Sequence, residues 1–259
     1  MSLIRRTTAP MTPQRFFEEV LLAPLFWPGK TIRLERNSIV DFRQRPMAPH
    51  VSVAELYHEN SKLFPEMLPE LNVNFEEASA IRREFVQRRA IVMKSTAPLN
   101  LELDQRYRDM VARAAQSLST ELFYAIDLRV VSGGLLAVYE PVFNNFQVVK
   151  RLSPDALGTL GHAIHLMNSA DTATLNWPLM LLVGSFARND VLLGLRGYRR
   201  TLLEAGHIAQ ALTAAAQELS ISTRLYYDFA DRELDTIMEA DGVEQGTVTI
   251  LEIGGVLGG

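Results

Sequence analysis

The stretch "RGYRRTLLEAGHIAQALTAAAQ", residues 196–217, is a long helical pattern and decides the fold of this chain. Small and apolar residues recur along it at helical spacing and therefore share one face: Ala205, Ala209, Leu212 and Ala216. Gly206 lies beside this stripe, although a glycine within a helix costs about 1 kcal/mol relative to alanine. Two interpretations are open: close approach of a helix from another subunit, or room for a bulky side chain within one subunit.

Composition limits what the chain can do. Its 259 residues are 47% hydrophobic, which is enough for one large domain or two small ones. A net charge of -4 with interspersed signs gives no electrostatic reason to bind nucleic acid. The longest apolar run, "PLMLLVG" at 178–184, is far shorter than the roughly 20 residues of a membrane helix, so we expect a buried strand there and no membrane span.

The chain contains no cysteine, which excludes disulfides, thiolate metal sites and cysteine nucleophiles. This composition fits a cytoplasmic protein. The first twenty residues include two early arginines but no apolar segment of the kind found in a secretory signal. We therefore expect a cytoplasmic location.

Two regions differ in their regularity. Residues 1–75 contain eight prolines in short, poorly periodic segments, and we interpret them as an irregular N-terminal arm. Within the arm, 12–24 is typical of a short helix and 31–42 of a strand or hairpin. Residues 76–259 are more regular and form the second predicted domain.

In the regular region, helices and strands are mixed. Helices are expected over 74–90, 100–117, 153–165, 196–217 and 231–241. Strands are expected over 121–130, 135–142, 146–152, 178–184, 222–229 and 246–255. The first three strands are joined by short turns, among them the Ser-Gly-Gly of "VSGGLL" at 131–136. This order predicts an α+β fold with an antiparallel-rich central sheet flanked by helices.

Several stretches carry a resemblance to a known family. "RGYRRTLLEAGHIAQALTAAAQEL", "YYDFADRELDTIMEADG" and "TVTILEIGG" are similar to the C-terminal half of the nitroreductase-like flavoproteins, particularly the SagB-type dehydrogenases. "AELYHENSKL" at 54–63 resembles an N-terminal signature of the same group. The resemblance implies a nitroreductase-like fold, FMN at a dimer interface, and a long central helix that carries that interface and explains Gly206.

The resemblance also implies phosphate-binding residues near the start of the domain. "RRAIVMKSTAPL" at 88–99 matches the arginine-rich segment of the family, so Arg88 and Arg89 are expected to bind FMN. Ala90 and Val92 replace a serine and a second arginine of the pattern. Nearby cations offer substitutes: Lys94, Arg82 and Arg83.

Other predicted cofactor residues lie further along the chain. Ser117 remains from the Pro-Ser-x-Gly loop of the family, and Arg196 and Arg199 remain from the Arg-Gly-Tyr-Arg block. In place of a Gly-Leu-Gly loop beside the flavin ring, this chain has Ser220 and Ile221, which makes close backbone approach less easy.

The proton-handling pair of the azoline-oxidising members is replaced. Where they carry Lys-Tyr just before the arginine block, this chain has Leu192 and Leu193, which neither accept nor donate a proton. A base must therefore lie elsewhere, or the reaction must differ from azoline oxidation. Tyr198 and Tyr227 are the candidate catalytic residues, although packing is the more common role of such tyrosines.

One histidine pair and one His-Glu pair could carry other chemistry. His162 and His165 have a helical spacing that can bind a metal, but no third ligand is evident nearby, so no metal site is expected. His58 and Glu59 could form an acid-base pair, with a polar contact as the alternative.

Two functions from different classes are therefore open. One is an FMN-dependent oxidoreductase resembling the SagB-type azoline dehydrogenases of peptide natural-product biosynthesis, acting on a peptide or on a heterocycle bound to a carrier protein. The other is a diverged, non-catalytic or flavin-poor partner subunit of a peptide-modifying complex. In both cases we expect a homodimer, or a heterodimer with a related subunit.

Overall fold

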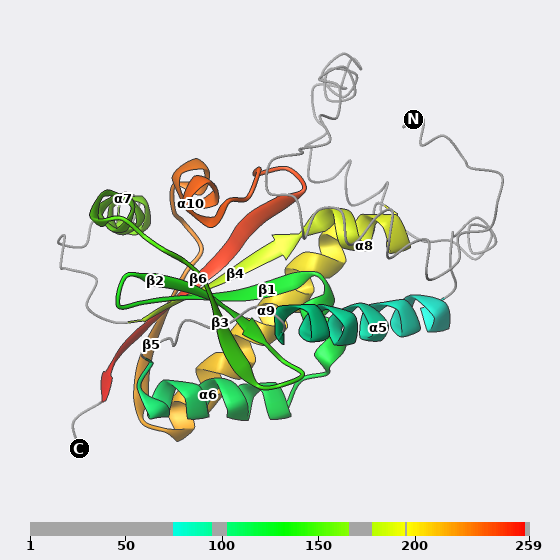
Figure 1. Cartoon of the computed structure of the whole chain (residues 1–259), viewed down its shortest axis with the longest axis horizontal. Coiled ribbons are helices and arrows are strands. Elements are labelled where there is room, and N and C mark those ends of the chain that lie inside the picture. The colour runs from blue at the N-terminus through cyan, green and yellow to red at the C-terminus, as the bar shows by residue number, and fades with distance from the viewer. Residues whose placement is uncertain (1–74, 95–102, 166–177, 195, 257–259) are drawn as a thin grey trace, which may run out of the picture. The chain divides into compact units, whose positions relative to one another are not determined.

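The computed structural model describes residues 75–94, 103–165, 178–194 and 196–256 (Figure 1). Apart from Phe75, the predicted N-terminal arm lies outside the described residues, as do the helix expected over 12–24, the strand or hairpin over 31–42, and the His58–Glu59 pair. The described elements follow in this order: α5 (Phe75–Lys94), α6 (Gln105–Gln116), the 3-10 helix η3 (Thr120–Tyr124), β1 (Ile126–Ser132), β2 (Leu135–Glu140), β3 (Asn145–Arg151), α7 (Pro154–His165), β4 (Leu179–Ser185), α8 (Phe186–Leu193), α9 (Arg196–Glu218), β5 (Ile221–Tyr226), α10 (Asp231–Met238) and β6 (Gln245–Val256).

The strands form one six-stranded sheet in the order β3-β2-β1-β4-β6-β5. All five neighbouring pairs are antiparallel, which confirms the predicted α+β fold with an antiparallel-rich sheet. At the centre, β1 runs beside β4, with Ile126 opposite Gly184 and Val131 opposite Leu179. Every residue of β4 is buried, because this strand has a neighbour on each edge and helices over both faces.

The turn between β1 and β2 confirms the predicted hairpin. Gly133 and Gly134 have φ values of +55° and +72°, and the flanking Ser132 and Leu135 are paired across the strands. Two consecutive residues with positive φ are the requirement of the type I′ turn, which suits the twist of a two-residue hairpin. Glycine adopts this backbone without steric cost.

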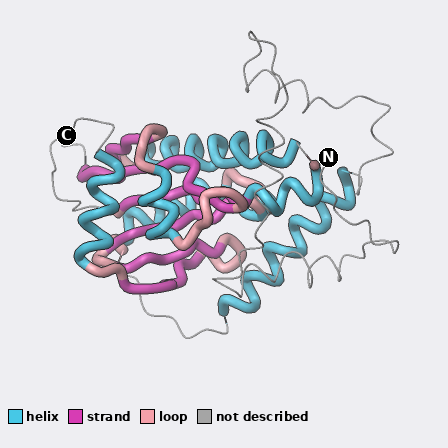
Figure 2. Tube along the Cα trace, turned by 90° about the horizontal axis from the view of Figure 1, so that it is seen from above, coloured by secondary structure: helices cyan, strands magenta, loops and turns pink. Residues whose placement is uncertain are grey.

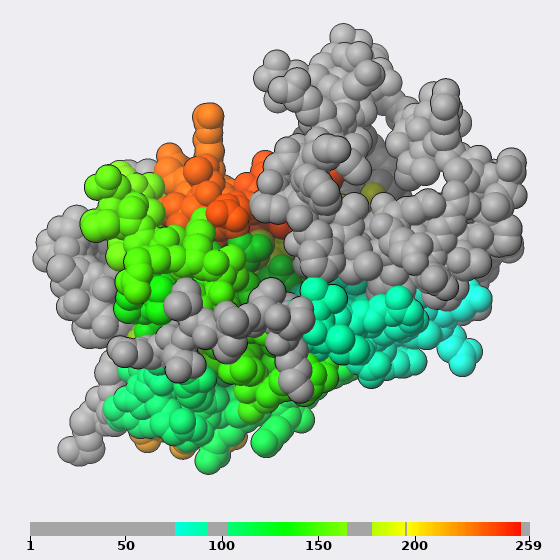
Figure 3. Space-filling view, in the orientation of Figure 1, coloured from blue at the N-terminus to red at the C-terminus, as the bar shows by residue number. Residues whose placement is uncertain are grey.

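Helices cover the two faces of the sheet and define two cores. On one face, α6 and α9 pack over a core that includes Met110, Leu128, Met180 and Leu251. On the other face, α7 and α10 pack together over a core that includes Leu181. Figure 1 shows these layers on opposite sides of the strands, Figure 2 shows them from above, and α7 and α10 form neighbouring parts of one surface in Figure 3.

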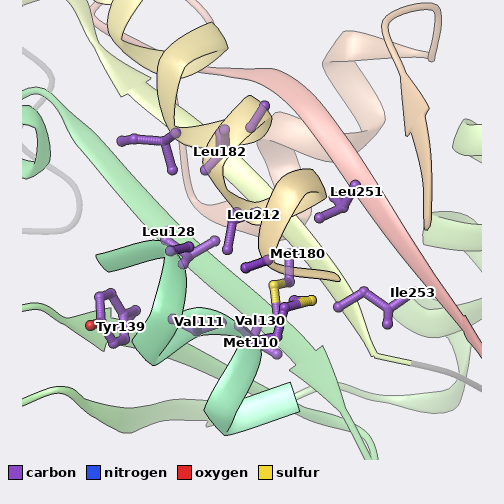
Figure 4. Close-up of a cluster of buried hydrophobic side chains, with 14 of the residues drawn as sticks. Met110, Val111, Leu128, Val130, Tyr139, Met180, Leu182, Leu212, Leu251 and Ile253 are labelled. Carbon is purple, nitrogen blue, oxygen red and sulfur yellow. The ribbon is translucent and has the colours of Figure 1, made fainter. Parts of the chain in front are cut away.

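The predicted stripe on α9 is the part of this helix that enters the core. Its four residues, Ala205, Ala209, Leu212 and Ala216, are all at most 4% exposed. Figure 4 shows Leu212 among the labelled side chains of the strands, in the cluster to which Leu128 and Met180 also belong. The stripe is therefore the face by which α9 packs on the sheet of its own chain.

Three local predictions differ from the structure. The strand expected over 121–130 begins later, because Ser119 accepts a hydrogen bond from the backbone of Glu121 and starts the helix η3. The helix expected over 231–241 ends at Met238, where Glu239 adopts a left-handed φ of 57°. The short helix α8 was not predicted, because its buried residues include the polar Arg188 and Asn189 and so give no apolar period.

The environment of Gly206 bears on its two interpretations. Gly206 is exposed, and no described atom of another element lies within 4 Å of the position that a Cβ would take. Within the described part of this chain, the glycine therefore makes no room for a bulky side chain. Close approach of a helix from another subunit remains a prediction.

Candidate functional site: an arginine cleft

A cleft of about 350 Å³ opens between α5, η3 and the junction of α8 with α9. We call it the arginine cleft, because four of its lining residues are arginines. Its lining residues are Ala78, Ser79, Arg82, Glu121, Leu193, Arg196, Arg199, Arg200 and Leu203. Residues from three separate parts of the chain therefore meet at one site.

The tight junction between α8 and α9 places the cluster of arginines on α9. Gly197 is buried against the backbone of α8, and a Cβ at this position would lie 2.4 Å from the backbone nitrogen of Asp190. Only glycine permits this approach. Three arginines follow at i, i+3 and i+4 of the helix and so occupy one side of it: Arg196, Arg199 and Arg200.

Arg82 enters the cleft from the buried side of α5. It lies between Ile81 and Phe85 on a stripe that faces the protein, and its side chain is 5% exposed. Its guanidinium lies over the ring of Tyr124, and Nη2 donates to the backbone oxygen of Glu121 over 3.0 Å. The same nitrogen donates to Glu204 of α9. A cation that is this deeply buried needs such partners.

Glu204 connects all three helices around the cleft. Besides Arg82 of α5, it accepts a hydrogen bond from Arg200 Nε over 2.6 Å and one from Asn189 Nδ2 of α8 over 3.1 Å. Its side chain is 3% exposed. The buried carboxylate is therefore fully engaged with groups of the protein.

Glu121 is the second carboxylate of the site. Ser79 Oγ donates to it over 2.6 Å, and Arg83 Nη1 donates to it over 2.5 Å. Burial alone would raise the pKa of Glu121, but these two hydrogen bonds and the charges of Arg83 and Arg82 outweigh burial and hold the pKa below its usual value. Glu121 is therefore ionised at neutral pH.

Among the described residues, the lining of the cleft contains more positive than negative charge. Its four arginines face two carboxylates, Glu121 and Glu204, and Glu121 also pairs with Arg83, which lies outside the lining. Within the described residues, Arg196 forms no ion pair. Converging guanidinium groups with fewer carboxylates than cations are suited to bind an anion, above all a phosphate or a carboxylate.

The structure brings together only some of the residues predicted to bind the cofactor. Arg196 and Arg199 line the cleft, whereas Arg88 and Arg89 do not. Arg88 is exposed and pairs with Glu84 over 2.5 Å. Arg89 is buried and pairs with Asp127 of β1 over 2.7 Å. Because the two are adjacent on one helix, their side chains point about 100° apart.

Ser117 lies near the other end of α9. It follows the last turn of α6, where its Oγ donates to the backbone oxygen of Ala114 over 2.8 Å. One turn earlier, Arg113 pairs with Glu218, the last residue of α9. Because a helix of 23 residues is roughly 34 Å long, one chain does not bring Ser117 to the arginine cleft.

The two candidate catalytic tyrosines are exposed and do not line the cleft. The ring of Tyr198 packs against Phe186 with centroids 4.9 Å apart, and Tyr227 follows the end of β5 with 69% of its surface exposed. By contrast, Leu193 lines the cleft, and Leu192 is buried beside it. The position that carries a proton-handling group in the azoline-oxidising members therefore lies in the cleft wall.

Ser220 occupies the position at which the sequence resemblance implies a glycine loop. Ser220 has a φ of 54°, in the left-handed region that favours glycine. It lies in the turn between α9 and β5, at the end of α9 that is remote from the cleft. A glycine would adopt this backbone without steric cost.

Sequence reasoning considered Arg82 only as a substitute and did not single out Arg200, Glu121 or Glu204. A signal was present for two of them. Arg82 shares its helical stripe with the apolar Ile81 and Phe85, and Arg200 follows Arg196 by one turn. Glu121 gave no such signal, since its partners lie about forty residues away in the sequence, and the (i, i+4) spacing of Arg200 and Glu204 did not reveal the distant partner Arg82.

The described residues contain neither a metal-binding cluster nor a membrane-spanning helix. In the ranges that the structure describes, no three histidine, aspartate or glutamate residues are grouped so that they could hold a metal ion. His162 is exposed on α7. None of the described helices combines the length and apolarity that a membrane crossing requires.

Comparison with known proteins identifies the fold. No protein-family model matches the sequence, and no curated protein matches it either. Among solved structures, a putative nitroreductase from Anabaena variabilis is similar, with a TM-score of 0.57 and 17% identity over 79% of this chain. The match spans 46% of the Anabaena chain. The chain therefore has a nitroreductase-like fold.

Two further solved structures match with lower TM-scores. The microcin synthetase McbBCD complex of E. coli contains a chain that matches with a TM-score of 0.49 and 14% identity, over 84% of this chain and 87% of that one. A putative nitroreductase from Ralstonia eutropha matches with a TM-score of 0.46 and 14% identity, over 64% of this chain and 77% of that one.

Proposed function

We propose that this protein is an FMN-dependent oxidoreductase and that the arginine cleft holds the phosphate of the cofactor. The observation that carries the proposal is the position of Arg196 and Arg199. Both are expected from the sequence resemblance to bind FMN, and both line one cleft together with Arg82 and Arg200. The nitroreductase-like fold agrees with this assignment.

The residues of the cleft fit a phosphate group. Planar guanidinium groups match phosphate oxygens in pairs, and the arginines of α9 present three of them on one side of a rigid helix. Ala78, Leu193 and Leu203 supply apolar wall between the charges. When bound, FMN would supply the hydride acceptor, while these side chains would hold its phosphate and exclude water from it.

Proton removal requires a group other than Leu193. The carboxylate of Glu121 lines the same cleft, and Ser79 and Arg83 hold it in place in its ionised form. An ionised carboxylate at a fixed position is able to accept a proton from a substrate. Tyr198 and Tyr227 do not line the cleft, and the lowered pKa and the two hydrogen bonds of Glu121 make it a weak base, so the base is left unassigned.

The sequence resemblance supports a narrower assignment. It favours the SagB-type branch, in which the substrate is a peptide or a heterocycle bound to a carrier protein and the product belongs to a peptide natural-product pathway. A cytoplasmic location agrees with this role and with the absence of cysteine.

We further assign the outer face of α9 to a subunit interface. Leu203 is 67% exposed there, Leu202 and Tyr198 are also exposed, and Gly206 leaves open space beside them. An antiparallel pair of α9 helices would bring Ser117 of one protomer toward the arginine end of the other helix. A homodimer, or a heterodimer with a related subunit, would therefore reunite the predicted cofactor residues.

The alternative function is a flavin-poor partner subunit, and one contact favours it. Arg89, which the sequence motif assigns to phosphate, is already paired with the buried carboxylate of Asp127. An arginine that has an internal partner is not available to a ligand without breaking that pair.

Flavin binding by the full chain separates the two functions. The purified protein should show flavin absorbance that is released on denaturation, or should take up added FMN. Replacing Arg196 or Arg199 with alanine should weaken FMN binding by about tenfold or more, since a hydrogen bond to a charged group contributes about 1.5–3 kcal/mol. The matched control is R88A, which removes an exposed arginine of α5 outside the cleft.

Two results would count against the proposal. A colourless protein that takes up no added FMN would favour the partner-subunit alternative. Loss of FMN in R88A, with binding retained in R196A and R199A, would move the phosphate site to the arginine motif of α5.

A further inference from the structure

Glu204 is a buried carboxylate that contacts the arginine cleft from behind. It receives hydrogen bonds from α5, α8 and α9, through Arg82, Asn189 and Arg200. Two of these partners, Arg82 and Arg200, line the cleft, whereas Glu204 itself does not. Its contacts therefore bear on the orientation of the cleft arginines.

The contact with Arg200 uses one particular atom. Glu204 Oε1 lies 2.6 Å from Arg200 Nε, the nitrogen nearest the backbone end of the guanidinium. The side chain of Arg200 is 49% exposed, so its outer end remains accessible on the cleft side. Anchoring through Nε leaves the two terminal nitrogens, Nη1 and Nη2, as a fork for paired hydrogen bonds to an anion.

The contact with Arg82 fixes a second guanidinium. Arg82 Nη2 is shared between Glu204 and the backbone oxygen of Glu121, and the side chain is almost fully buried. The same carboxylate thus restrains two lining arginines, one from α5 and one from α9. Asn189 of α8, the third partner of Glu204, is itself buried. It also donates a hydrogen bond to Thr201 Oγ1 over 2.9 Å.

We infer that Glu204 is a positioning residue that preorganises Arg82 and Arg200 for a bound anion. The inference rests on the proposed function in taking the arginine cleft as the anion site. Glu204 would favour binding by reducing its entropic cost, because a guanidinium that is already held in place loses less conformational freedom when the anion binds.

The direction in which E204Q changes the affinity for an anion distinguishes a positioning role of Glu204 from a simple effect of its charge. The variant E204Q removes a negative charge beside four arginines, so electrostatics alone would strengthen anion binding. If Glu204 orients the arginines, E204Q weakens binding although the cleft has become more positive. We expect affinity to fall by about tenfold, the size of one charge-assisted hydrogen bond.

The experiment uses the full chain with two probes, FMN followed by fluorescence and inorganic pyrophosphate followed by calorimetry. The control is E218Q, which removes the same charge from an exposed site at the end of α9. A second variant, R200K, keeps the charge of an exposed side chain but lacks the fork, so it does not depend on the folding of E204Q. R200K should also bind about tenfold more weakly, whereas E218Q should bind as the wild type does.

A double-mutant cycle tests whether the effect passes through Arg200. In an R200A background, E204Q should change affinity less than it does in the wild type. A merely structural role would instead give the same loss in both backgrounds. Circular dichroism measures the folded fraction of each variant, and each measured affinity is corrected for that fraction.

The outcomes separate this inference from the proposed function. A folded E204Q that binds both probes as tightly as the wild type or more tightly overturns the inference, as does an R200K that binds like the wild type. A wild type that binds pyrophosphate but not FMN overturns the proposed function and leaves the inference standing. A wild type that binds neither probe overturns both.

Discussion

Arg89 of α5 donates a hydrogen bond of 2.7 Å from Nη1 to Oδ1 of Asp127 on β1, and both side chains are buried. Two further arginines surround the carboxylate: Arg188 at 3.5 Å and Arg129 at 3.8 Å. Burial alone would raise the pKa of Asp127, but the charges of Arg188, Arg89 and Arg129 outweigh it and hold the pKa below its usual value. An arginine predicted to bind phosphate is thus part of a buried ionic cluster.

Removing the charge of Asp127 should destabilise the fold strongly. D127N leaves three buried or half-buried guanidinium groups without their shared counterion, and we expect the free energy of unfolding to fall by about 3–5 kcal/mol. Urea titration measures it. The control D109N alters an exposed carboxylate on α6 and should change stability by less than about 0.5 kcal/mol. A loss in D127N no larger than in D109N would show that the cluster contributes no net stability.

The same carboxylate should give stability a dependence on pH. Because its pKa is lower in the folded state, the stabilisation is present above the unfolded value of about 3.9 and is lost as pH falls through the folded value. The stability difference between wild type and D127N should therefore shrink below about pH 4. Denaturant titrations across the acid range measure this difference, and a difference independent of pH would contradict the depressed pKa.

The two glycines of α9 should respond oppositely to alanine. G197A forces a methyl group onto the backbone of α8, and we expect a loss of about 1–3 kcal/mol or more. G206A places the methyl group in open space on an exposed turn and should raise the stability of the isolated chain by about 0.5–1 kcal/mol. Chemical denaturation of both variants provides the comparison. Equal losses would mean that Gly206 is packed in solution.

If α9 forms the subunit interface, a large charged residue at Gly206 should prevent association. We expect sedimentation of the wild type as a dimer and of G206R as a folded monomer, because the arginine would occupy the space of the second helix. H162R, on an exposed site of α7 that lies on the other face of the sheet, is the control and should remain a dimer. A dimeric G206R would place the interface elsewhere on the protein.

The core face and the outer face of α9 should differ in their sensitivity to truncation. L212A removes a side chain that is 1% exposed among the strands, and we expect a loss of about 2–5 kcal/mol. L203A, on a side chain that is 67% exposed, should change the stability of the isolated chain by less than about 0.5 kcal/mol. Thermal or urea unfolding distinguishes them, and a small effect of L212A would contradict the central position of α9.

Much of the local structure was predictable because it depends on neighbouring residues. The stripe from Ala205 to Ala216 follows the period of a helix, and the structure buries it. The pair Gly133-Gly134 satisfies a turn that few other residues can form, and the structure places the hairpin there. These features depend on residues that are close together in the chain, so the sequence alone is enough to predict them.

The candidate site was only partly predictable, because similar residues acquire different roles once the chain folds. Arg88 and Arg89 are adjacent in one motif, yet Arg88 faces solvent and Arg89 lies in a buried cluster. Gly206 attracted notice in the sequence, whereas Gly197 is the glycine that the packing of this chain requires. In each case the deciding contact is with another element.

The sequence by itself determined most of the helices and strands and the buried face of α9, because hydrophobic period and turn chemistry act over short distances. It did not reveal α8 or η3, which carry no such apolar period. The tertiary structure alone decided which charges form a site. Arg82 and Glu204 are separated by 122 positions, and they become partners only when α5 and α9 meet. A buried charge is stable only beside its counterion, and no local pattern states which distant residue will provide it.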